Sequence, residues 1–135
     1  MKNLQVACAI IERDGKVLAA QRSERMSLPL KWEFPGGKIK EQEAPEACLV
    51  REVMEELGLR VTVGMALQKV SHAYPDFAVT LSPFICSIAA GTLTLHEHKM
   101  VKWLPPTRLL SLDWAEADLP IITNYLELFR RNELR

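Results

Sequence analysis

One stretch of 23 residues limits what this chain can fold into more than any other part of its sequence. It begins at Gly37, reaches Glu43 after five intervening residues and Arg51 after seven more, and ends at Leu59. Its last part contains three closely spaced glutamates: Glu52, Glu55 and Glu56. Carboxylates three and four positions apart on a helix repel each other, and a hard divalent cation, which prefers oxygen ligands, relieves that repulsion.

A helix is predicted for the second half of this stretch, from about Pro45 to Leu57. Proline suits the first turn, where its missing N–H would have no partner in any case, and Gly58 can adopt the left-handed conformation that ends a helix. At about 100° per residue the three glutamates fall on one side of this helix. The opposite side is expected to be buried, and it carries Ala47, Val50, Val53, Met54 and Leu57.

The surroundings of the glutamates favour a functional site over a solvated acidic surface. Arg51 can pair with Glu55 one turn along the helix, or it can reach back to Glu43 in the preceding loop. Acidic helix faces that only meet solvent are common, and that is the alternative interpretation. The preceding segment Phe34-Pro35-Gly36-Gly37 argues against it, because two glycines allow a backbone carbonyl to approach a ligand closely.

The filled positions of this stretch match the Nudix box, G-x5-E-x7-R-E-U-x-E-E-x-G-U, in which U is a bulky aliphatic residue. The chain therefore resembles the Nudix hydrolases, which use divalent metal ions to cleave nucleoside diphosphates linked to another group. The resemblance implies an α/β fold, the Nudix α/β/α sandwich with a mixed sheet, and Mg²⁺ or Mn²⁺ as the cofactor. It also implies that Arg51 and Glu43 brace the loop against the helix.

Segments outside the box resemble the MutT-type nucleoside triphosphate pyrophosphohydrolases, and among them the branch called CTP pyrophosphohydrolase. The segments that carry this likeness are Ile10–Lys16, Ala20–Arg22, Trp32–Lys38, His96–His98 and Ala117–Pro120. The resemblance implies a small-molecule nucleotide substrate and cleavage of a nucleoside triphosphate to a monophosphate and pyrophosphate. Expected substrates are oxidised or modified nucleotides, namely 8-oxo-dGTP, CTP or dCTP, or 5-substituted dCTP, and the expected role is nucleotide-pool sanitation.

The same resemblance implies roles in metal binding and catalysis. The metal ligands would be Gly36 through its carbonyl, Glu52, Glu55, Glu56 and Glu97. The catalytic residues would be Arg51, Glu52, Glu55 and Glu97. Either Glu55 or Glu97 would act as the general base. Two histidines flank Glu97, and the alternative there is a zinc site on His96 and His98, for which the sequence places no third ligand nearby.

Substrate contacts are implied at five further positions. Arg22 and Lys38 would contact phosphates, Phe34 and Tyr74 would flank the base, and Asp118 stands where MutT has a base-reading asparagine. Arg22 could instead be a solvated strand end, Tyr74 could be core packing, and Asp118 could cap the final helix. An aspartate in place of the asparagine argues against strict specificity for 8-oxo-guanine, because an ionised carboxylate only accepts hydrogen bonds.

Two other functions stay open. One is an ADP-ribose or nucleotide-sugar pyrophosphatase, since Pro75 lies sixteen residues past the box, where such enzymes often have a proline. The other is a non-catalytic Nudix module that senses nucleotides. Such modules usually lack some of the box glutamates, which are all present in this chain.

Composition sets the remaining expectations. A chain of 135 residues suits one domain, 1–135, and equal numbers of basic and acidic residues, 17 each, give no general attraction to nucleic acid or anionic membrane. Cys8, Cys48 and Cys86 lie in apolar surroundings and are expected to be buried free thiols, as in a reducing compartment. We therefore expect a cytoplasmic monomer with neither a nucleic-acid polymer nor a membrane as partner.

The rest of the chain alternates between predicted strands and loops. Predicted strands are Leu4–Ile11, Val17–Gln21, a short one at Trp32–Phe34, Arg60–Gly64, Met65–His72, Phe77–Ala89, Gly91–Leu95 and Met100–Leu104. A hairpin turn is expected at Arg13–Lys16, and Pro83 indicates an edge strand or a bulge. A short helix is expected around Arg108–Leu110. A final helix should run from near Leu119 to Arg131, with Ile122, Tyr125, Leu126 and Phe129 buried.

Overall fold

Eight strands and two α-helices make up residues 2–131, the part of the chain that this computed structural model describes. The strands are β1 (Lys2–Arg13), β2 (Lys16–Gln21), β3 (Trp32–Glu33), β4 (Gly36–Lys38), β5 (Leu59–Ala66), β6 (Val70–Ala73), β7 (Phe77–Gly91) and β8 (Met100–Leu104). The helices are α1 (Pro45–Leu57) and α2 (Leu119–Arg130), with 3-10 helices η1 (Pro106–Ser111) and η2 (Glu116–Asp118).

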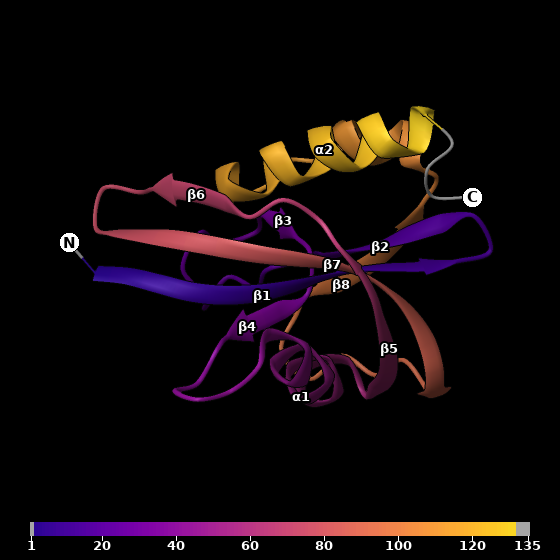
Figure 1. Ribbon diagram of the computed structural model, residues 1–135, viewed down its shortest axis with the longest axis horizontal. Coiled ribbons are helices and arrows are strands. Elements are labelled where there is room, and N and C mark those ends of the chain that lie inside the picture. The colour runs from indigo at the N-terminus through magenta and orange to yellow at the C-terminus, as the bar shows by residue number, and fades with distance from the viewer. Residues whose placement is uncertain (1, 132–135) are drawn as a thin grey trace.

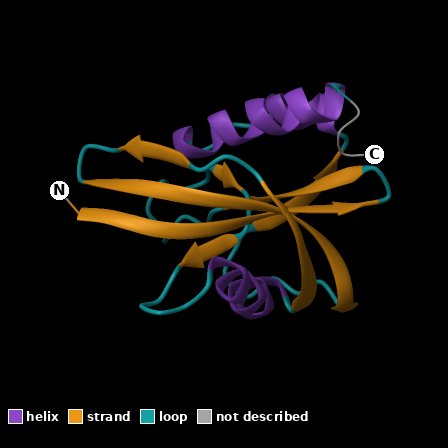
Figure 2. Ribbon diagram, in the orientation of Figure 1, coloured by secondary structure: helices purple, strands orange, loops and turns teal. Residues whose placement is uncertain are grey.

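All eight strands belong to one mixed sheet, with α2 over one face and α1 over the other (Figure 1). The main strand order is β3-β2-β1-β7-β5, while β4 pairs with β1, β6 with β7 and β8 with β2. Figure 2 shows the same three layers, with the strands between the two helices. This arrangement confirms the predicted α/β/α sandwich with a mixed sheet.

The centre of the sheet is the parallel pair β1 and β7, in register from Lys2↔Phe77 to Glu12↔Ser87. Alternate residues of β1 face opposite layers, so Ile10 packs in the core under α2 and Ile11 in the core under α1. A strand covered on both faces needs a near-continuous apolar run, which β1 has. The predicted hairpin turn is also present, with Asp14 and Gly15 both at positive φ between β1 and β2.

Pro83 lies in the central strand β7, so the expectation of an edge strand is wrong. The expected irregularity is present, because the pairing of β5 with β7 shifts register between Val63 and Ala66. Beyond that point β6 replaces β5 as the partner, beginning at Val70. Pro83 stands at this change of partner, where its carbonyl accepts a hydrogen bond from the N–H of Leu67 at 2.9 Å.

Two segments differ from their predictions. The strand predicted at Gly91–Leu95 is wrong, because only Gly91 belongs to a strand. After it, the N–H groups of Thr94 and His96 donate to the carbonyls of Leu57 and Glu56, so this segment satisfies the C-terminal end of α1. The short strand β4, made of Gly36, Gly37 and Lys38, was not predicted.

Helix α1 has the predicted bounds, and Gly58 ends it in the left-handed conformation. Its predicted buried face is confirmed at Val53 and Leu57 but wrong at Ala47, Val50 and Met54, which are exposed. The buried residues are Cys48, Leu49, Val53, Glu56 and Leu57. The helix is therefore rotated from the predicted orientation, so that the Glu56 carboxylate faces the sheet and accepts a hydrogen bond from the N–H of Gly36 in β4.

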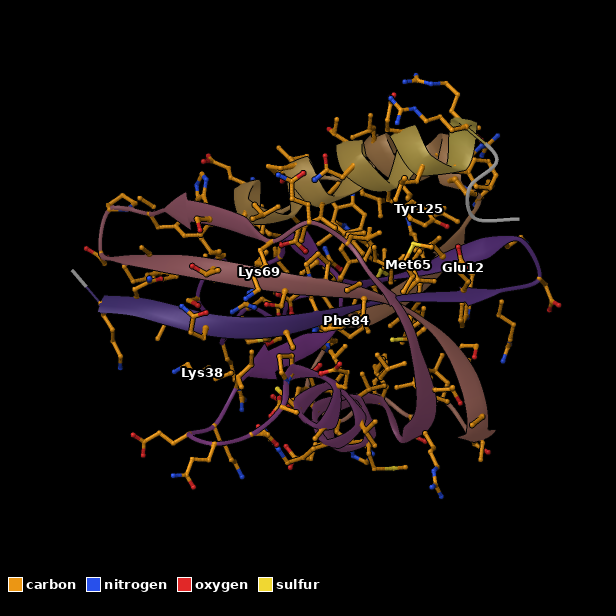
Figure 3. The ribbon with its side chains drawn as sticks, in the orientation of Figure 1. Glu12, Lys38, Met65, Lys69, Phe84 and Tyr125 are labelled. Carbon is orange, nitrogen blue, oxygen red and sulfur yellow. The ribbon has the colours of Figure 1, made fainter. Side chains whose placement is uncertain are left out.

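Helix α2 covers the opposite face of the sheet, and it ends one residue earlier than predicted. Ile122 and Tyr125 are buried as expected, while Leu126 and Phe129 are half-buried. The Tyr125 hydroxyl donates to the carboxylate of Glu12, which lies close to it in Figure 3. The three cysteines are buried free thiols, as predicted. No helix among residues 2–131 is long and apolar enough to cross a membrane.

Candidate functional site

A cavity of about 500 Å³ brings together residues from distant parts of the chain. Its floor is the face of β1 and β7 that carries Leu4, Val6, Val79 and Leu81. Seven of the eleven predicted site residues line it: Arg22, Phe34, Gly36, Lys38, Glu56, Tyr74 and Asp118. The other four, Arg51, Glu52, Glu55 and Glu97, do not line it.

Glu56 is the buried carboxylate of α1, and only 7% of its surface is exposed. Its Oε1 accepts a hydrogen bond from the N–H of Gly36 at 3.3 Å. Burial, followed by the charges of Glu33, Glu97 and Glu52, raises the pKa of Glu56 to about 9. Negative charge is therefore concentrated at a place with little solvent to screen it.

Arg51 holds the loop before α1 in place. Its Nε and Nη2 donate to the two carboxylate oxygens of Glu43, each at 2.9 Å, and Nη2 also donates to the Lys38 carbonyl at 3.2 Å. These bonds lower the pKa of Glu43 to about 2. Both pairings considered from the sequence are present, because Nη1 lies 3.7 Å from Glu55. Nη1 also donates to Glu52, a partner that we did not predict.

The two glycines of β4 allow the helix and β1 to approach closely. A Cβ on Gly36 would lie 2.0 Å from the carbonyl oxygen of Ala7, and a Cβ on Gly37 would lie 2.1 Å from Oε1 of Glu52. Neither distance is compatible with a side chain. Gly36 therefore permits the pairing with β1, and Gly37 leaves the space that the Glu52 carboxylate fills.

The chemistry of these acidic groups fits a divalent cation. Glu52, Glu55 and Glu56 project from α1, and Glu97 from the exposed loop before β8 supplies charge to the same place. Oxygen ligands and excess negative charge suit a hard cation such as Mg²⁺. Within residues 2–131 no three acidic, histidine or cysteine side chains already converge on one point. Glu52 in particular is bound to Arg51, so it would have to turn to become a ligand.

Asp118 forms a buried polar contact in the cavity wall. Its Oδ2 accepts a hydrogen bond from the backbone N–H of Phe34 at 2.9 Å. The helix-capping alternative is wrong, since the Asp118 side chain makes no capping bond at the start of α2. Burial, followed by the charge of Glu33, raises the pKa of Asp118 to about 8, although the bond from Phe34 opposes this rise.

Tyr74 is buried in the core, as one of its two alternatives expected, and it also lines the cavity. It is buried, and its hydroxyl accepts a hydrogen bond from the N–H of Ala117 at 3.0 Å. Its ring lies 4.5 Å from that of His72 and 5.0 Å from that of Phe77. The ring is thereby held in the cavity lining next to the segment that carries Asp118.

Arg22 is not a solvated strand end. Its Nη1 donates to Oε1 of Glu33 at 2.6 Å, and its Nε and Nη2 donate to the carbonyl and hydroxyl of Ser27 at 2.6 and 3.0 Å. Two of its five N–H donors stay available to a ligand. The other predicted phosphate contact, Lys38, is exposed and extends from β4 (Figure 3).

Glu33 and His98 belong to the site although the sequence did not single them out for it. Glu33 lines the cavity, and its Oε2 lies 2.8 Å from Nε2 of His98. His98 is buried and His96 is exposed, so the two histidines do not face one metal site. The available signal for Glu33 was its place in the short strand β3, directly before Phe34 and close to the two glycines. Alternation of polar and apolar residues alone, however, does not show whether a side chain faces a cavity or solvent.

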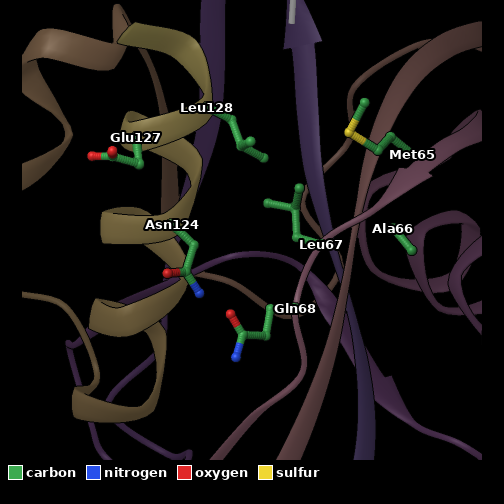
Figure 4. Close-up of a pocket in the computed structure, with 7 residues that line it drawn as sticks. All are labelled: Met65, Ala66, Leu67, Gln68, Asn124, Glu127 and Leu128. Atoms are coloured by element: carbon green, nitrogen blue, oxygen red, sulfur yellow. The ribbon is translucent and has the colours of Figure 1, made fainter. Parts of the chain in front are cut away.

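A second cavity of about 390 Å³ lies between α2 and the segment after β5, and Figure 4 shows it in close-up. Its lining consists of Met65, Ala66, Leu67, Gln68, Asn124, Glu127 and Leu128. None of the eleven predicted site residues lines it. Glu56 of α1 and the buried Asp118 both line the first cavity, which is therefore the candidate site.

Comparisons with known proteins show what this chain is similar to. A model of the family described as NUDIX domain matches residues 1–125. The CTP pyrophosphohydrolase of Escherichia coli (strain K12) is 38% identical over 128 residues, which is 95% of this chain and 95% of that protein. The 8-oxo-dGTP diphosphatase of the same strain is 30% identical over 129 residues, 95% of this chain and 100% of that protein.

A solved structure is similar over the whole chain. The solution structure of the E. coli ORF135 protein matches with a TM-score of 0.85 at 35% identity. The match covers 100% of this chain and 96% of that one. The likeness in sequence and the likeness in fold therefore extend over the same residues.

Proposed function

This chain belongs to the NUDIX family, and from that premise we propose that it hydrolyses nucleoside triphosphates to nucleoside monophosphates and pyrophosphate. The proposed substrates are oxidised or modified nucleotides: 8-oxo-dGTP, CTP or dCTP, and 5-substituted dCTP. Relatives named CTP pyrophosphohydrolase and 8-oxo-dGTP diphosphatase, each aligned over 95% of this chain, support both the reaction and a role in nucleotide-pool sanitation.

The observation that carries the proposal is the single cavity that Glu56 and Asp118 share. Glu56 belongs to an acidic helix face suited to a cation and phosphates, whereas Asp118 stands in a wall with Phe34 and Tyr74. A nucleoside triphosphate has the same division, with a charged phosphate chain and a flat base. The apolar floor formed by β1 and β7 suits the base, which gains by leaving water.

Nudix hydrolases use divalent metal ions, and we propose Mg²⁺ or Mn²⁺ here. When bound, such an ion neutralises phosphate charge and lowers the pKa of an attacking water. The proposed ligands are Glu52, Glu55, Glu56, Glu97 and the Gly36 carbonyl. Those that are side chains are all carboxylates, which is the ligand chemistry that these ions prefer.

The remaining residues have positioning and proton-transfer roles in the proposal. Glu55 or Glu97 accepts the proton of the attacking water, because both are exposed carboxylates beside the other proposed metal ligands. Arg51 keeps the loop and Glu52 in position through its bonds to Glu43 and Glu52.

The substrate contacts follow the cavity lining. Arg22 and Lys38 bind phosphates, with the two free N–H groups of Arg22 as donors. Phe34 and Tyr74 flank the base, which lies against the sheet. Asp118 forms a hydrogen bond with the polar edge of the base. A cytoplasmic location and a monomeric state are further predictions of this proposal.

A panel of nucleoside triphosphates with Mg²⁺, scored by kcat/KM, tests the proposal. It should include 8-oxo-dGTP, dGTP, CTP, dCTP and 5-methyl-dCTP, with ADP-ribose and a nucleotide sugar as alternatives. Phosphorus NMR should detect monophosphate and pyrophosphate. Orthophosphate with a diphosphate would contradict the proposed cleavage, preference for ADP-ribose would favour the other hydrolase class, and binding without turnover would favour a sensor.

A further inference from the structure

A chain of hydrogen bonds through four residues connects Ser27 in the cavity lining to the loop that carries Glu97. The four residues are Ser27, Arg22, Glu33 and His98. Ser27, in the cavity lining, accepts two hydrogen bonds from Arg22, and Arg22 donates to Oε1 of Glu33 at 2.6 Å. Oε2 of Glu33 is 2.8 Å from Nε2 of His98. Glu33 therefore has a partner on each carboxylate oxygen, Arg22 on Oε1 and His98 on Oε2.

The last member of this chain of hydrogen bonds, His98, is poorly explained by packing alone. Its side chain has no exposed surface, and its Nδ1 is buried without a hydrogen-bond partner among residues 2–131. A buried ring nitrogen without a partner destabilises a fold, so an apolar side chain of similar size would be more favourable at this position. Among residues 2–131 the bond to Glu33 is the one polar contact of the His98 side chain, so it is the contact that explains a polar residue at this buried position.

The backbone next to His98 fixes the loop in the same place. The N–H of Lys99 donates to the carbonyl of Gln21 at 2.9 Å, beside Arg22, and the Lys99 ammonium pairs with Glu24. On the other side of Glu97, the N–H of His96 donates to the carbonyl of Glu56. The exposed Glu97 thus stands between one anchor on the cavity wall and one anchor on α1.

We propose that His98 is a positioning residue that fixes the Glu33 carboxylate, and through it Arg22, in the cavity wall and ties that wall to the Glu97 loop. This inference rests on the proposed nucleotide hydrolysis. With Nε2–H donating to Oε2, Glu33 cannot turn toward the cavity or away from Arg22. Loss of the donor leaves Oε2 buried without a partner, so Glu33, Arg22 and the loop lose their common arrangement.

Two substitutions of similar size separate this role from simple packing. In His98→Gln the amide nitrogen is three bonds from Cβ, as Nε2 is in histidine, whereas in His98→Asn it is only two bonds away. We expect H98Q to retain kcat/KM within about threefold of the unsubstituted enzyme, and H98N to lose about ten- to a hundredfold, the usual effect of losing a hydrogen bond to a charged group. Equal losses in the two variants would overturn the proposal.

His96→Gln is the matched control, because the exposed His96 side chain flanks Glu97 on the other side. A double-mutant cycle with Glu33→Ala then tests the route. If His98 acts through Glu33, the H98N/E33A enzyme should be no worse than E33A, within about threefold. Losses that multiply instead would show that His98 acts independently of Glu33.

A measurement without turnover completes the test and covers variants that fail to fold. Long-range ¹H–¹⁵N spectra of the ligand-free protein should show a hydrogen-bonded Nε2–H on His98, and this signal should be lost or strongly shifted in E33A. An unchanged His98 signal in E33A would overturn the proposal. Absence of hydrolysis of every triphosphate by the unsubstituted protein would refute the proposed function instead, so the two failures are distinguishable.

Discussion

The carboxylate of Asp118 accepts a hydrogen bond from the backbone N–H of Phe34 at 2.9 Å, across 84 positions of the chain. The contact joins the start of α2 to the segment that enters β4, and both residues line the cavity. It also uses only one carboxyl oxygen. With a pKa of about 8, the other oxygen carries a proton at neutral pH and can donate to a ligand as well as accept from one.

The first prediction concerns base selection by Asp118. Replacement by alanine should lower kcat/KM for cytosine or oxidised-purine nucleotides by about ten- to several hundredfold, because one buried polar contact to the base is left unmade. Nucleotides that offer no matching group should be much less affected. The measurement is the same nucleotide panel applied to both proteins.

Asp118→Asn is the matched control for this prediction. Asparagine keeps the shape, one acceptor for the Phe34 N–H and donors toward the cavity, as the protonated carboxyl does. The D118N enzyme should therefore stay closer to the unsubstituted enzyme than D118A does. An unchanged order of substrates in D118A would reject the base-reading role, whatever happens to the melting temperature.

The second prediction is a dependence of stability on pH that comes from Asp118. Its pKa is raised from 3.8 to about 8 on folding, so between these values the folded protein holds a proton that the unfolded chain has released. The contribution is fully present below pH 3.8 and is lost as pH rises through about 8. The slope is at most about −1.4 kcal/mol per pH unit.

Urea unfolding of the D118N protein and the unsubstituted protein at several pH values measures this contribution. The difference between their unfolding free energies isolates Asp118, because all other titrating groups are shared. We expect the advantage of aspartate over asparagine to shrink between pH 4 and pH 8. A difference that stays nearly constant from pH 5 to pH 8 would mean that Asp118 is ionised in the folded protein, because neither state then changes protonation over this range.

Local rules allowed correct prediction of the elements with strong local signals. Pro45 and Gly58 determine the ends of α1 through their own backbone preferences, and the turn at Asp14–Gly15 depends on two residues that tolerate positive φ. The spacing from Gly37 to Leu59 identified the acidic helix for a similar reason. Each of these features is encoded within a few residues, so no knowledge of distant contacts is needed.

The features that we did not predict depend on distant parts of the chain. Val50 and Met54 have the apolar character of core residues, yet both are exposed, while Glu56 is buried and accepts a hydrogen bond from the N–H of Gly36 in β4. The segment after Gly91 was read as a strand from its alternation, but its N–H groups bind the end of α1. Periodicity reports that one face is buried, and it does not report which neighbour covers that face.

The third prediction compares the two glycines of β4. Gly36→Ala places a Cβ against the backbone of Ala7, which cannot move without breaking the sheet, so it should destabilise the fold by about 3 kcal/mol or more. Gly37→Ala places a Cβ against the end of the Glu52 side chain, which can turn away. G37A should therefore fold better than G36A but lose metal-dependent hydrolysis.

Thermal unfolding and kcat/KM on the same samples distinguish these effects. Gly15→Ala is a useful comparison, since no atom lies within 4 Å of its added Cβ and only the positive φ opposes it. It should lower stability by about 1 kcal/mol and leave hydrolysis unchanged. Normal activity in G37A would contradict the importance of Glu52 at this position.

The last prediction concerns Glu56 and the metal. Its pKa is raised to about 9 mainly by burial and further by the neighbouring carboxylates, so in the metal-free protein it holds a proton at neutral pH. A cation binds the ionised form and displaces that proton, so binding becomes stronger as pH rises toward 9. Mn²⁺ affinity should increase by up to about tenfold per pH unit between pH 6.5 and 8.5, one proton being released per ion. Glu56→Gln should weaken binding, remove most of this dependence and abolish most hydrolysis.

Calorimetric Mn²⁺ titrations at three pH values measure the slope, and Glu46→Gln, on the exposed first turn of α1, is the control. A slope that persists in E56Q, or near-normal turnover with metal bound, would assign the role to another carboxylate.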